Sequence, residues 1–138
     1  MIILVDGNNT LMAWPALEPL NRASTAALSD ASLRLVAAIG RYHAGTARAH
    51  RIIVVFDGPP RPAVGEMARG EGIEVNFGAG ESADRLILEE ADDIKGREPN
   101  AEILVVTSDR ALARQAEWLG ARVMAPRTFE TEVAFYKA

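Results

Sequence analysis

Four acidic residues stand beside the short apolar runs of this chain. Asp6, Asp57 and Asp109 follow expected strands directly or within two residues, and Asp84 falls in the first turn of an expected helix. In a parallel α/β sheet the carboxyl ends of the strands open on one edge, where such folds bind ligands. We therefore expect four carboxylates that are far apart in the sequence to meet in space.

Carboxylates gathered in this way repel one another and raise their own pKa values unless a cation lies among them. The chain has no cysteine and only two histidines, without the spacing of a metal-binding pair. Ligands that are all hard oxygens favour Mg²⁺ or Mn²⁺ over zinc. Such an ion can polarise a phosphoryl oxygen and turn a bound water into a nucleophile. The pattern predicts metal-assisted hydrolysis of a phosphodiester, with one or two ions.

Each acid also has a structural explanation when it is taken singly. Asp6 and Asp57 each precede a glycine, and Asp-Gly is a common turn dipeptide. Asp109 can cap the helix that follows it, and Asp84 can favour the positive end of its helix dipole. The metal site is favoured because the pattern recurs four times.

Three polar neighbours extend the candidate site. Asn9 lies just beyond the first strand, where its amide can position an attacking water or a phosphate oxygen without adding charge. Asn8 can take this role instead, which would leave Asn9 as a turn former. Glu81 either completes the metal site or is a solvated acid of the loop.

Strands and helices alternate along the chain. Short apolar runs predict strands at residues 2–5, 51–56, 73–76, 102–107 and 122–125. Apolar residues at helical spacing predict helices at about 22–44, 82–95 and 109–119 and a docking helix that carries Phe129, Val133 and Tyr136. Residues 63–72 are rich in glycine and charge, which indicates a surface loop or a poorly ordered helix. The order predicts one α/β domain over residues 1–138, with a mostly parallel sheet covered on both faces.

Composition narrows the class of protein. The 138 residues suit one domain, and the absence of cysteine excludes disulfides and thiol nucleophiles. The first apolar run is too short for a signal peptide or a membrane span, so we expect a cytoplasmic protein. The net charge of −4 does not by itself suggest a nucleic-acid binder. A cation held among the acids would offset part of this charge locally.

Four segments, in this order along the chain, resemble a known family. They are IILVDGNN at residues 2–9, VVFDG at 54–58, ESADR at 81–85 and VVTSDR at 105–110. Together they resemble the NYN domains, specifically the YacP-like branch of the PIN-like ribonuclease superfamily. The resemblance covers nearly the whole chain. It implies a PIN-like (Rossmann-like) three-layer α/β/α fold with a central, mostly parallel sheet.

The resemblance also implies an activity, which is Mg²⁺- or Mn²⁺-dependent cleavage of RNA by an endoribonuclease. Position by position, Asp6 and Asn9 match the family's Asp-Gly-x-Asn, Asp57 its second-strand acid, Asp84 its helix-start acid and Asp109 its Ser-Asp acid. The four acids would then hold the metal, and Asn9 would help to place the water or the phosphate. Single-stranded RNA is the expected substrate.

Arginines near these motifs are candidates for RNA contacts. Arg85 and Arg110 each follow a proposed metal ligand, so each either reaches a substrate phosphate or orients the neighbouring acid. Arg61 and Arg69 lie in or near the Pro/Gly-rich segment and are better placed to touch an RNA backbone, unless they are merely solvated.

The two tryptophans have less specific explanations. Trp14 either stacks on a base or packs against a helix, and packing is the commoner case. We expect Trp118 in the core or in a contact between subunits.

Two other functions remain open. A non-catalytic PIN-like module would bind RNA or a protein without cleaving either. A haloacid-dehalogenase-like phosphatase also begins with an acid after the first strand, but it needs a second acid where Asn8 stands. The sequence leaves open RNA against DNA, a homodimer, and a ribosome or another protein as partner.

Overall fold

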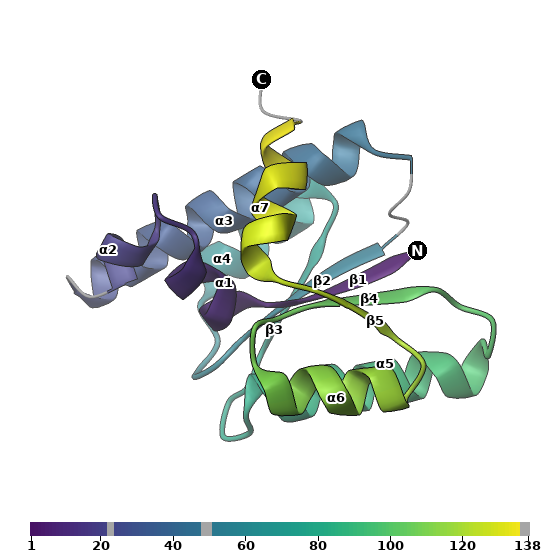
Figure 1. The fold of residues 1–138 in the computed structure, drawn as a ribbon. Coiled ribbons are helices and arrows are strands. Elements are labelled where there is room, and N and C mark those ends of the chain that lie inside the picture. Colours follow the sequence, from purple (N-terminus) through teal and green to yellow (C-terminus); the bar gives the residue numbers. More distant parts are fainter. Residues whose placement is uncertain (22–23, 48–50, 136–138) are drawn as a thin grey trace.

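Five parallel strands form one sheet in the order β3-β2-β1-β4-β5 (Figure 1). This computed structural model describes residues 1–21, 24–47 and 51–135. The strands are β1 (Ile2–Asp6), β2 (Arg51–Phe56), β3 (Glu74–Phe77), β4 (Ile103–Val106) and β5 (Arg122–Met124). Each lies within two residues of its predicted position, because short runs of β-branched and other apolar residues are typical of strands that are buried on both faces.

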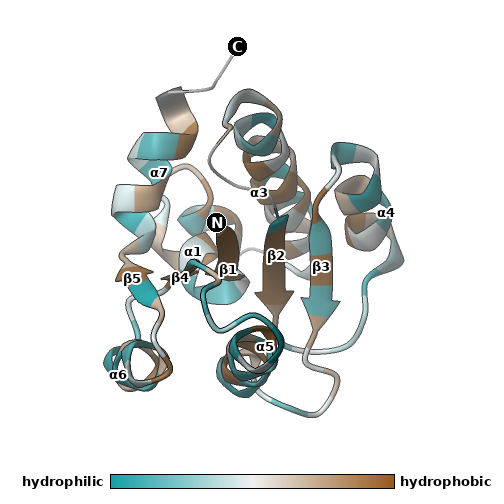
Figure 2. Ribbon diagram, turned by 90° about the vertical axis from the view of Figure 1, so that its right-hand side faces the viewer, coloured by the Kyte–Doolittle hydropathy of each residue, from teal (hydrophilic) through white to brown (hydrophobic). Residues whose placement is uncertain are grey.

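Helices cover both faces of the sheet (Figures 1 and 2). They are α1 (Gly7–Ala13), α2 (Glu18–Asn21), α3 (Thr25–Gly45), α4 (Pro62–Glu71), α5 (Ala83–Arg97), α6 (Arg110–Trp118) and α7 (Pro126–Phe135). Helices α5 and α6 lie on one face, while α1, α3, α4 and α7 lie on the other. The predicted three-layer arrangement is therefore confirmed.

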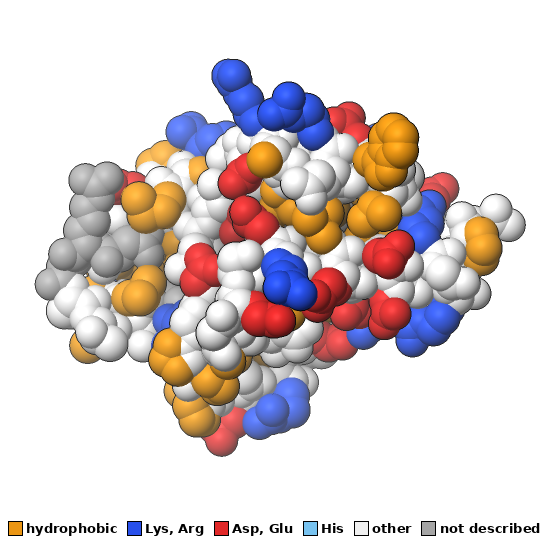
Figure 3. Space-filling view, turned by 90° about the horizontal axis from the view of Figure 1, so that it is seen from below, with side chains coloured by type: hydrophobic (Ala, Val, Ile, Leu, Met, Phe, Trp, Pro, Cys, Tyr) orange, Lys and Arg blue, Asp and Glu red, His pale blue; other side chains and the backbone are white. Residues whose placement is uncertain are grey.

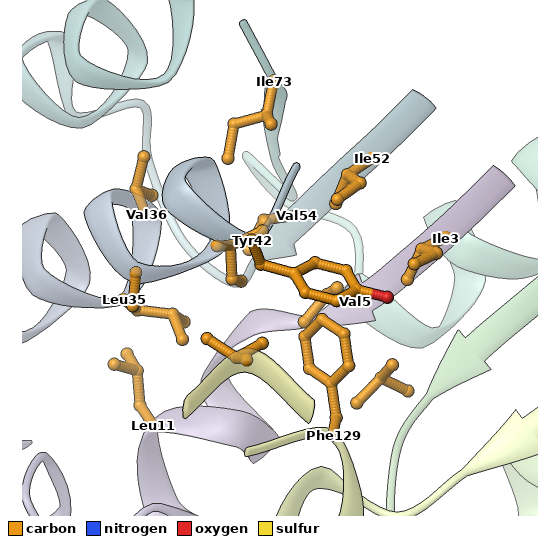
Figure 4. Close-up of a cluster of buried hydrophobic side chains, with 14 of the residues drawn as sticks. Ile3, Val5, Leu11, Leu35, Val36, Tyr42, Ile52, Val54, Ile73 and Phe129 are labelled. Carbon is orange, nitrogen blue, oxygen red and sulfur yellow. The ribbon is translucent and has the colours of Figure 1, made fainter. Parts of the chain in front are cut away.

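Alternate residues of the central strands feed two separate cores. In β1, Ile3 and Val5 point toward α3 and α7, while Leu4 points toward α5. Figure 4 shows the first core, where the edge of the Tyr42 ring meets Phe129 with ring centroids 5.6 Å apart. This alternation is a consequence of the two-residue period of a strand.

The terminal helix docks as the sequence predicted. Phe129 and Val133 are fully or almost fully buried, whereas Tyr136 lies outside the described residues. Trp14 packs against the same helix, since its indole Nε1 donates to the carbonyl oxygen of Pro126 over 2.9 Å. Of the two alternatives for Trp14, the structure shows helix packing.

Two features of the helices differ from the prediction. Residues 62–71 form a regular helix, α4, because Pro62 fits its first turn and Val64 and Ala68 are buried against the first core. The short helices α1 and α2 were not predicted. Helix α3 begins at Thr25 with Ser24 as its N-cap, and the predicted start at Arg22 lies outside the described residues.

Trp118 is not in the core, because 90% of its surface is exposed. Helix α6 packs on the sheet through Leu112 and Ala116, which are the residues that it buries, and Trp118 is not part of this buried face. In the part of the chain that the structure describes, no helix has the length and apolar character that crossing a bilayer requires.

Gly7 lets α1 approach the sheet closely, and replacing it by alanine should destabilise the protein. An added Cβ would lie 2.6 Å from Cδ1 of Phe56 and 2.9 Å from the carbonyl oxygen of Val55. We expect Gly7→Ala to lower the free energy of unfolding by about 1–3 kcal/mol, measured by urea denaturation. Gly65→Ala in α4 is the matched control, because its nearest neighbour would be 3.8 Å away. An equal loss in both variants would contradict this explanation.

Candidate functional site

The four predicted acids lie at the carboxyl ends of the strands, and we call Asp6, Asp57, Asp84 and Asp109 the acidic edge. Asp6 ends β1, Asp57 follows β2, Asp84 is in the first turn of α5 and Asp109 is the N-cap of α6. Their carboxylates are close enough to affect one another's pKa values. Asp57 and Asp84 both raise the pKa of Asp6, and Asp57 and Asp109 both raise the pKa of Asp84.

Asp6 is the most enclosed of these acids, with 5% of its surface exposed. Its burial, together with the charges of Asp84 and Asp57, raises its pKa to about 6. Two hydrogen bonds oppose this rise: the backbone N–H of Asn9 donates to Oδ1 over 3.4 Å, and the hydroxyl of Thr107 donates to Oδ2 over 3.1 Å. Asp6 is therefore a buried acid whose charged form is held by donors from α1 and from the end of β4.

Thr107 links two members of the acidic edge and was missed by the sequence analysis. Its Oγ1 donates to Asp6 and accepts from the backbone N–H of Asp109 over 3.1 Å. The side chain is almost completely buried. The sequence offered one signal for this role: Thr107 places a hydroxyl directly after an all-apolar strand, and a hydroxyl that is buried there needs hydrogen-bond partners.

The two asparagines fasten α1 to the neighbouring strand ends. Oδ1 of Asn8 accepts from the backbone N–H of Asp57 over 2.7 Å. Oδ1 of Asn9 accepts from both the backbone N–H and the hydroxyl of Ser108, over 2.7 and 2.9 Å. Since both amide oxygens already accept hydrogen bonds, the Nδ2 groups are what either side chain has to offer a substrate oxygen.

Asp57 and Asp109 each hold the beginning of a helix. Oδ1 of Asp57 accepts from the backbone N–H of Ala83 over 2.8 Å, at the start of α5. Oδ1 of Asp109 accepts from the N–H groups of Ala111 and Leu112 over 2.9 and 3.0 Å, so it is an N-cap. The structural and functional explanations of these acids are therefore compatible, because the backbone N–H groups of the helices engage one carboxylate oxygen of each acid.

Asp84 faces the other acids from the first turn of α5. Partial burial raises its pKa, and the neighbouring carboxylates of Asp109 and Asp57 raise it further. A hydrogen bond with the side chain of Asp109 favours the protonated form of Asp84 in the same way. This is the repulsion that a cation would relieve.

The ligand atoms that the acidic edge offers are of the type that hard divalent cations bind. All four side chains offer carboxylate oxygens, which Mg²⁺ and Mn²⁺ prefer. Among the described residues, no three His, Cys, Asp or Glu side chains are already arranged to hold a metal ion. Asp6, Asp57 and Asp109 instead accept hydrogen bonds from N–H and hydroxyl groups.

The protein-family model of the YacP-like NYN domain matches residues 3–138 of the chain. The chain belongs to the YacP-like NYN domain family. This is a PIN-like family of the nuclease type. A search among curated proteins found no match for this NYN domain.

Two solved structures of Rae1 (YacP) from Bacillus subtilis are similar to this NYN domain. A mutant form shares 28% sequence identity with a TM-score of 0.78, over 99% of this chain and 76% of the other. The second structure shares 27% identity with a TM-score of 0.70, over 99% and 75% of the two chains. The fold is therefore the PIN-like α/β/α fold that the motifs predicted.

The predicted arginines of this NYN domain have different surroundings. Arg61 is half-buried: its guanidinium lies over the rings of Phe56 and Phe77, with centroids 5.0 and 5.6 Å away, and Nη1 donates to Ser32 over 2.8 Å. Burial lowers the pKa of Arg61. This arginine therefore packs between β2, β3 and α3 rather than extending from a loop into solvent.

The other candidate residues are more exposed. Arg85 forms an ion pair with Glu89, one turn along α5, with a nitrogen–oxygen distance of 3.0 Å. Arg69 is exposed in α4, Arg110 is exposed at the start of α6, and Glu81 is exposed in the loop before α5. Arg85 directly follows Asp84 and Arg110 directly follows Asp109, and of these two arginines only Arg85 forms an ion pair within the described residues.

Thr107→Val is expected to destabilise the NYN domain by about 1–3 kcal/mol, because it removes the donor to Oδ2 of the buried Asp6 carboxylate and leaves only the N–H of Asn9 at Oδ1. It should also raise the pKa of Asp6, since the hydroxyl of Thr107 lowers that pKa. Urea denaturation at pH 8 and an NMR titration of the carboxyl carbon measure the two effects. Thr107→Ser is the control, because it keeps the hydroxyl. Equal results for serine and valine would show that the hydroxyl is not the cause.

Proposed function

We propose that this NYN domain is a metal-dependent ribonuclease, specifically an endoribonuclease that hydrolyses single-stranded RNA. The observation that carries the proposal is the convergence of four carboxylates, in which the buried Asp6 interacts with Asp57 and Asp84, and Asp84 interacts with Asp57 and Asp109. Membership of a PIN-like family of the nuclease type supports the same reaction. Because that family is not the dehalogenase family, the phosphatase alternative has no support.

In this proposal the acidic edge holds the cation. Asp6, Asp57, Asp84 and Asp109 would be its ligands. When bound, Mg²⁺ or Mn²⁺ supplies Lewis acidity, which makes water a better nucleophile at phosphorus and stabilises the departing 3′ oxygen. Thr107 keeps the carboxylate of Asp6 in one orientation by its hydrogen bond to Oδ2.

The residues around the acids position the RNA backbone. Asn9 is fixed by two hydrogen bonds from Ser108, so its Nδ2 can donate to a phosphate oxygen without a further loss of side-chain freedom. Arg110 stands beside Asp109 and offers a positive charge to the neighbouring phosphate. Asn8 acts indirectly, since it fixes the backbone of Asp57.

The test is cleavage of a labelled single-stranded RNA in Mn²⁺, in Mg²⁺ and in EDTA. We expect cleavage with either ion by the wild type, none in EDTA, and a loss in the Asp84→Asn variant. Glu102→Gln is the matched control, because Glu102 is exposed just before β4, at the opposite end of that strand. DNA of the same sequence distinguishes the two nucleic acids. A folded wild type that binds RNA but never cleaves it would favour the non-catalytic module.

We further propose that the chain acts in the cytoplasm. The absence of cysteine suits a reducing compartment. Activity of the purified chain decides whether the domain needs a ribosome or another protein, and its molar mass in solution decides whether it is a homodimer.

A further inference from the structure

One face of α6 presents two arginines and a tryptophan to solvent. Arg110, Arg114 and Trp118 are four residues apart, so they lie along one side of the helix. The buried residues of α6, Leu112 and Ala116, are on the opposite side. We propose that these three residues, here called the α6 track, guide a single-stranded RNA to the acidic edge. The proposal rests on the proposed function and adds the path of the substrate.

The α6 track begins at the acidic edge itself. Asp109 is the N-cap of α6, and Arg110 is the first residue of the helix. With a rise of 1.5 Å per residue, Trp118 lies about 14 Å from Asp109 along the helix axis. An RNA strand that leaves the acidic edge along α6 therefore passes Arg110 and Arg114 before it reaches Trp118.

Trp118 has the surroundings of a stacking platform. Its indole is 90% exposed, whereas Trp14, the other tryptophan, is 5% exposed. Beside it is a hollow of about 290 Å³ lined by Leu88, Arg114, Gln115, Trp118 and Leu119. The face of a nucleobase can cover the indole here while Leu88 and Leu119 supply apolar contact. Stacking of this kind is how proteins hold single-stranded RNA without reading its sequence.

The arginines of the α6 track are available for phosphates. Within the described residues, Arg110 and Arg114 form no ion pair, whereas Arg85 is paired with Glu89 and Arg127 with Glu130. Figure 3 looks onto the face formed by α5 and α6, and basic side chains stand along its upper edge with hydrophobic and acidic ones beside them. Glu117 is the one acid within α6, near the far end. The start of the track therefore carries a local positive charge next to the acidic edge.

This combination favours a polyanion over a second copy of the chain. A protein partner for an exposed tryptophan would cover apolar surface and would need acids opposite Arg110 and Arg114. RNA provides both complements in a regular order, because each nucleotide carries one phosphate and one aromatic base. Although the chain has a net charge of −4, the two arginines of the α6 track have no ion-pair partner among the described residues and stand beside an exposed tryptophan.

The first experiment compares cleavage of a twelve-nucleotide RNA with that of a two-nucleotide RNA, whose single nucleotide on each side of the cleaved bond is too short to extend from the acidic edge to Trp118. We expect Trp118→Ala to raise KM for the long RNA about 5- to 100-fold, as the loss of one stacked base does. Both kcat and the cleavage of the short RNA should stay unchanged. Trp118→Phe should restore most of the affinity, since it keeps an aromatic face.

The second experiment measures binding directly, with an unlabelled twelve-nucleotide oligouridylate in EDTA. Stacking should quench the fluorescence of Trp118, and Trp118→Phe should abolish the quenching. Arg114→Ala should reduce the slope of log affinity against log salt by about 0.7, which is the value for one lost phosphate contact to a single strand. Arg41→Ala is the matched control, because Arg41 is exposed on α3, which covers the opposite face of the sheet from α6.

The outcomes separate the α6 track from the proposed function. Cleavage by the wild type, with KM unchanged in both Trp118→Ala and Arg114→Ala, would overturn the track alone. Absence of cleavage of every RNA by the folded wild type would overturn the proposed function and the track with it. A dimer that Trp118→Ala dissociates, without a change in KM, would assign the hollow to a second copy and would also overturn the proposal.

Discussion

Replacing Asp6 by asparagine is expected to reduce RNA cleavage about 10²- to 10³-fold, the loss that follows from removing one preorganised electrostatic group from an active site. The same change should make the metal-free protein more stable at pH 8. Asp6 is 5% exposed and lies among other carboxylates, so its charged form is unfavourable in the fold. Asparagine keeps the size and one acceptor oxygen without the charge.

The pH dependence of stability gives the sign of this effect. The pKa of Asp6 is about 6 in the folded protein, against 3.8 as its ordinary value. Between these values the folded state binds more protons than the unfolded state, so stability falls as pH rises from about 4 to 6. The difference corresponds to about 3 kcal/mol. Weakened hydrogen bonds to Thr107 and Asn9 offset part of it, which leaves a net gain of about 1–2 kcal/mol.

Urea denaturation in EDTA from pH 4 to pH 8, together with the rate of RNA cleavage, measures both parts of the prediction. The variant should lose the part of the decline in stability between pH 4 and 6 that comes from Asp6, while the raised pKa of Asp84 still contributes. Asp93→Asn is a control for charge alone, since Asp93 is exposed on α5. A variant that loses both activity and stability would instead assign Asp6 a structural role as the cap of α1.

The sheet and the long helices were predictable because their burial is periodic. In β1, alternate residues enter the two cores, and an all-apolar run is the sequence signature of that arrangement. Helix α5 likewise buries Ala83, Ile87, Ala91 and Ile94 at regular spacing. Such patterns are set by the backbone repeat and need no knowledge of tertiary contacts.

Helices α1 and α4 were harder to predict because tertiary contacts stabilise them against weak local preferences. Helix α1 has seven residues, begins with a glycine and is held by the hydrogen bonds of Asn8 and Asn9 to other strand ends. Helix α4 contains two glycines inside its span, yet Val64 and Ala68 bury one side of it. Partners far away in the sequence decide both cases, and a local pattern does not contain them.

The positions of the acidic residues followed from the order of the strands, whereas their hydrogen bonds did not. The sequence predicted that the carboxylates meet because parallel strands share one edge. It did not indicate that Thr107 bridges Asp6 and Asp109, or that Asn9 binds Ser108. Those contacts depend on side-chain rotamers, which are fixed only when the elements have packed.

Mn²⁺ is expected to stabilise the wild-type protein by about 2.7 kcal/mol when the free ion is at one hundred times its Kd, which is the linkage expected for one site. The physical reason is the repulsion at the acidic edge. Asp57 and Asp109 raise the pKa of Asp84, and a cation among the carboxylates would relieve this repulsion in the folded state alone.

Urea denaturation at pH 8 with Mn²⁺ or EDTA measures this stabilisation without any dependence on cleavage. Asp84→Asn should remove most of the gain, because it deletes one proposed ligand and the charge that attracts the ion. Glu102→Gln removes an exposed acid from the opposite end of β4 and should keep the full gain. If both variants are stabilised like the wild type, the ion binds elsewhere on an acidic chain and the acidic edge is not its site. If only Asp84→Asn loses the gain, the acidic edge binds the ion, and Asp84 is one of the residues on which that binding depends.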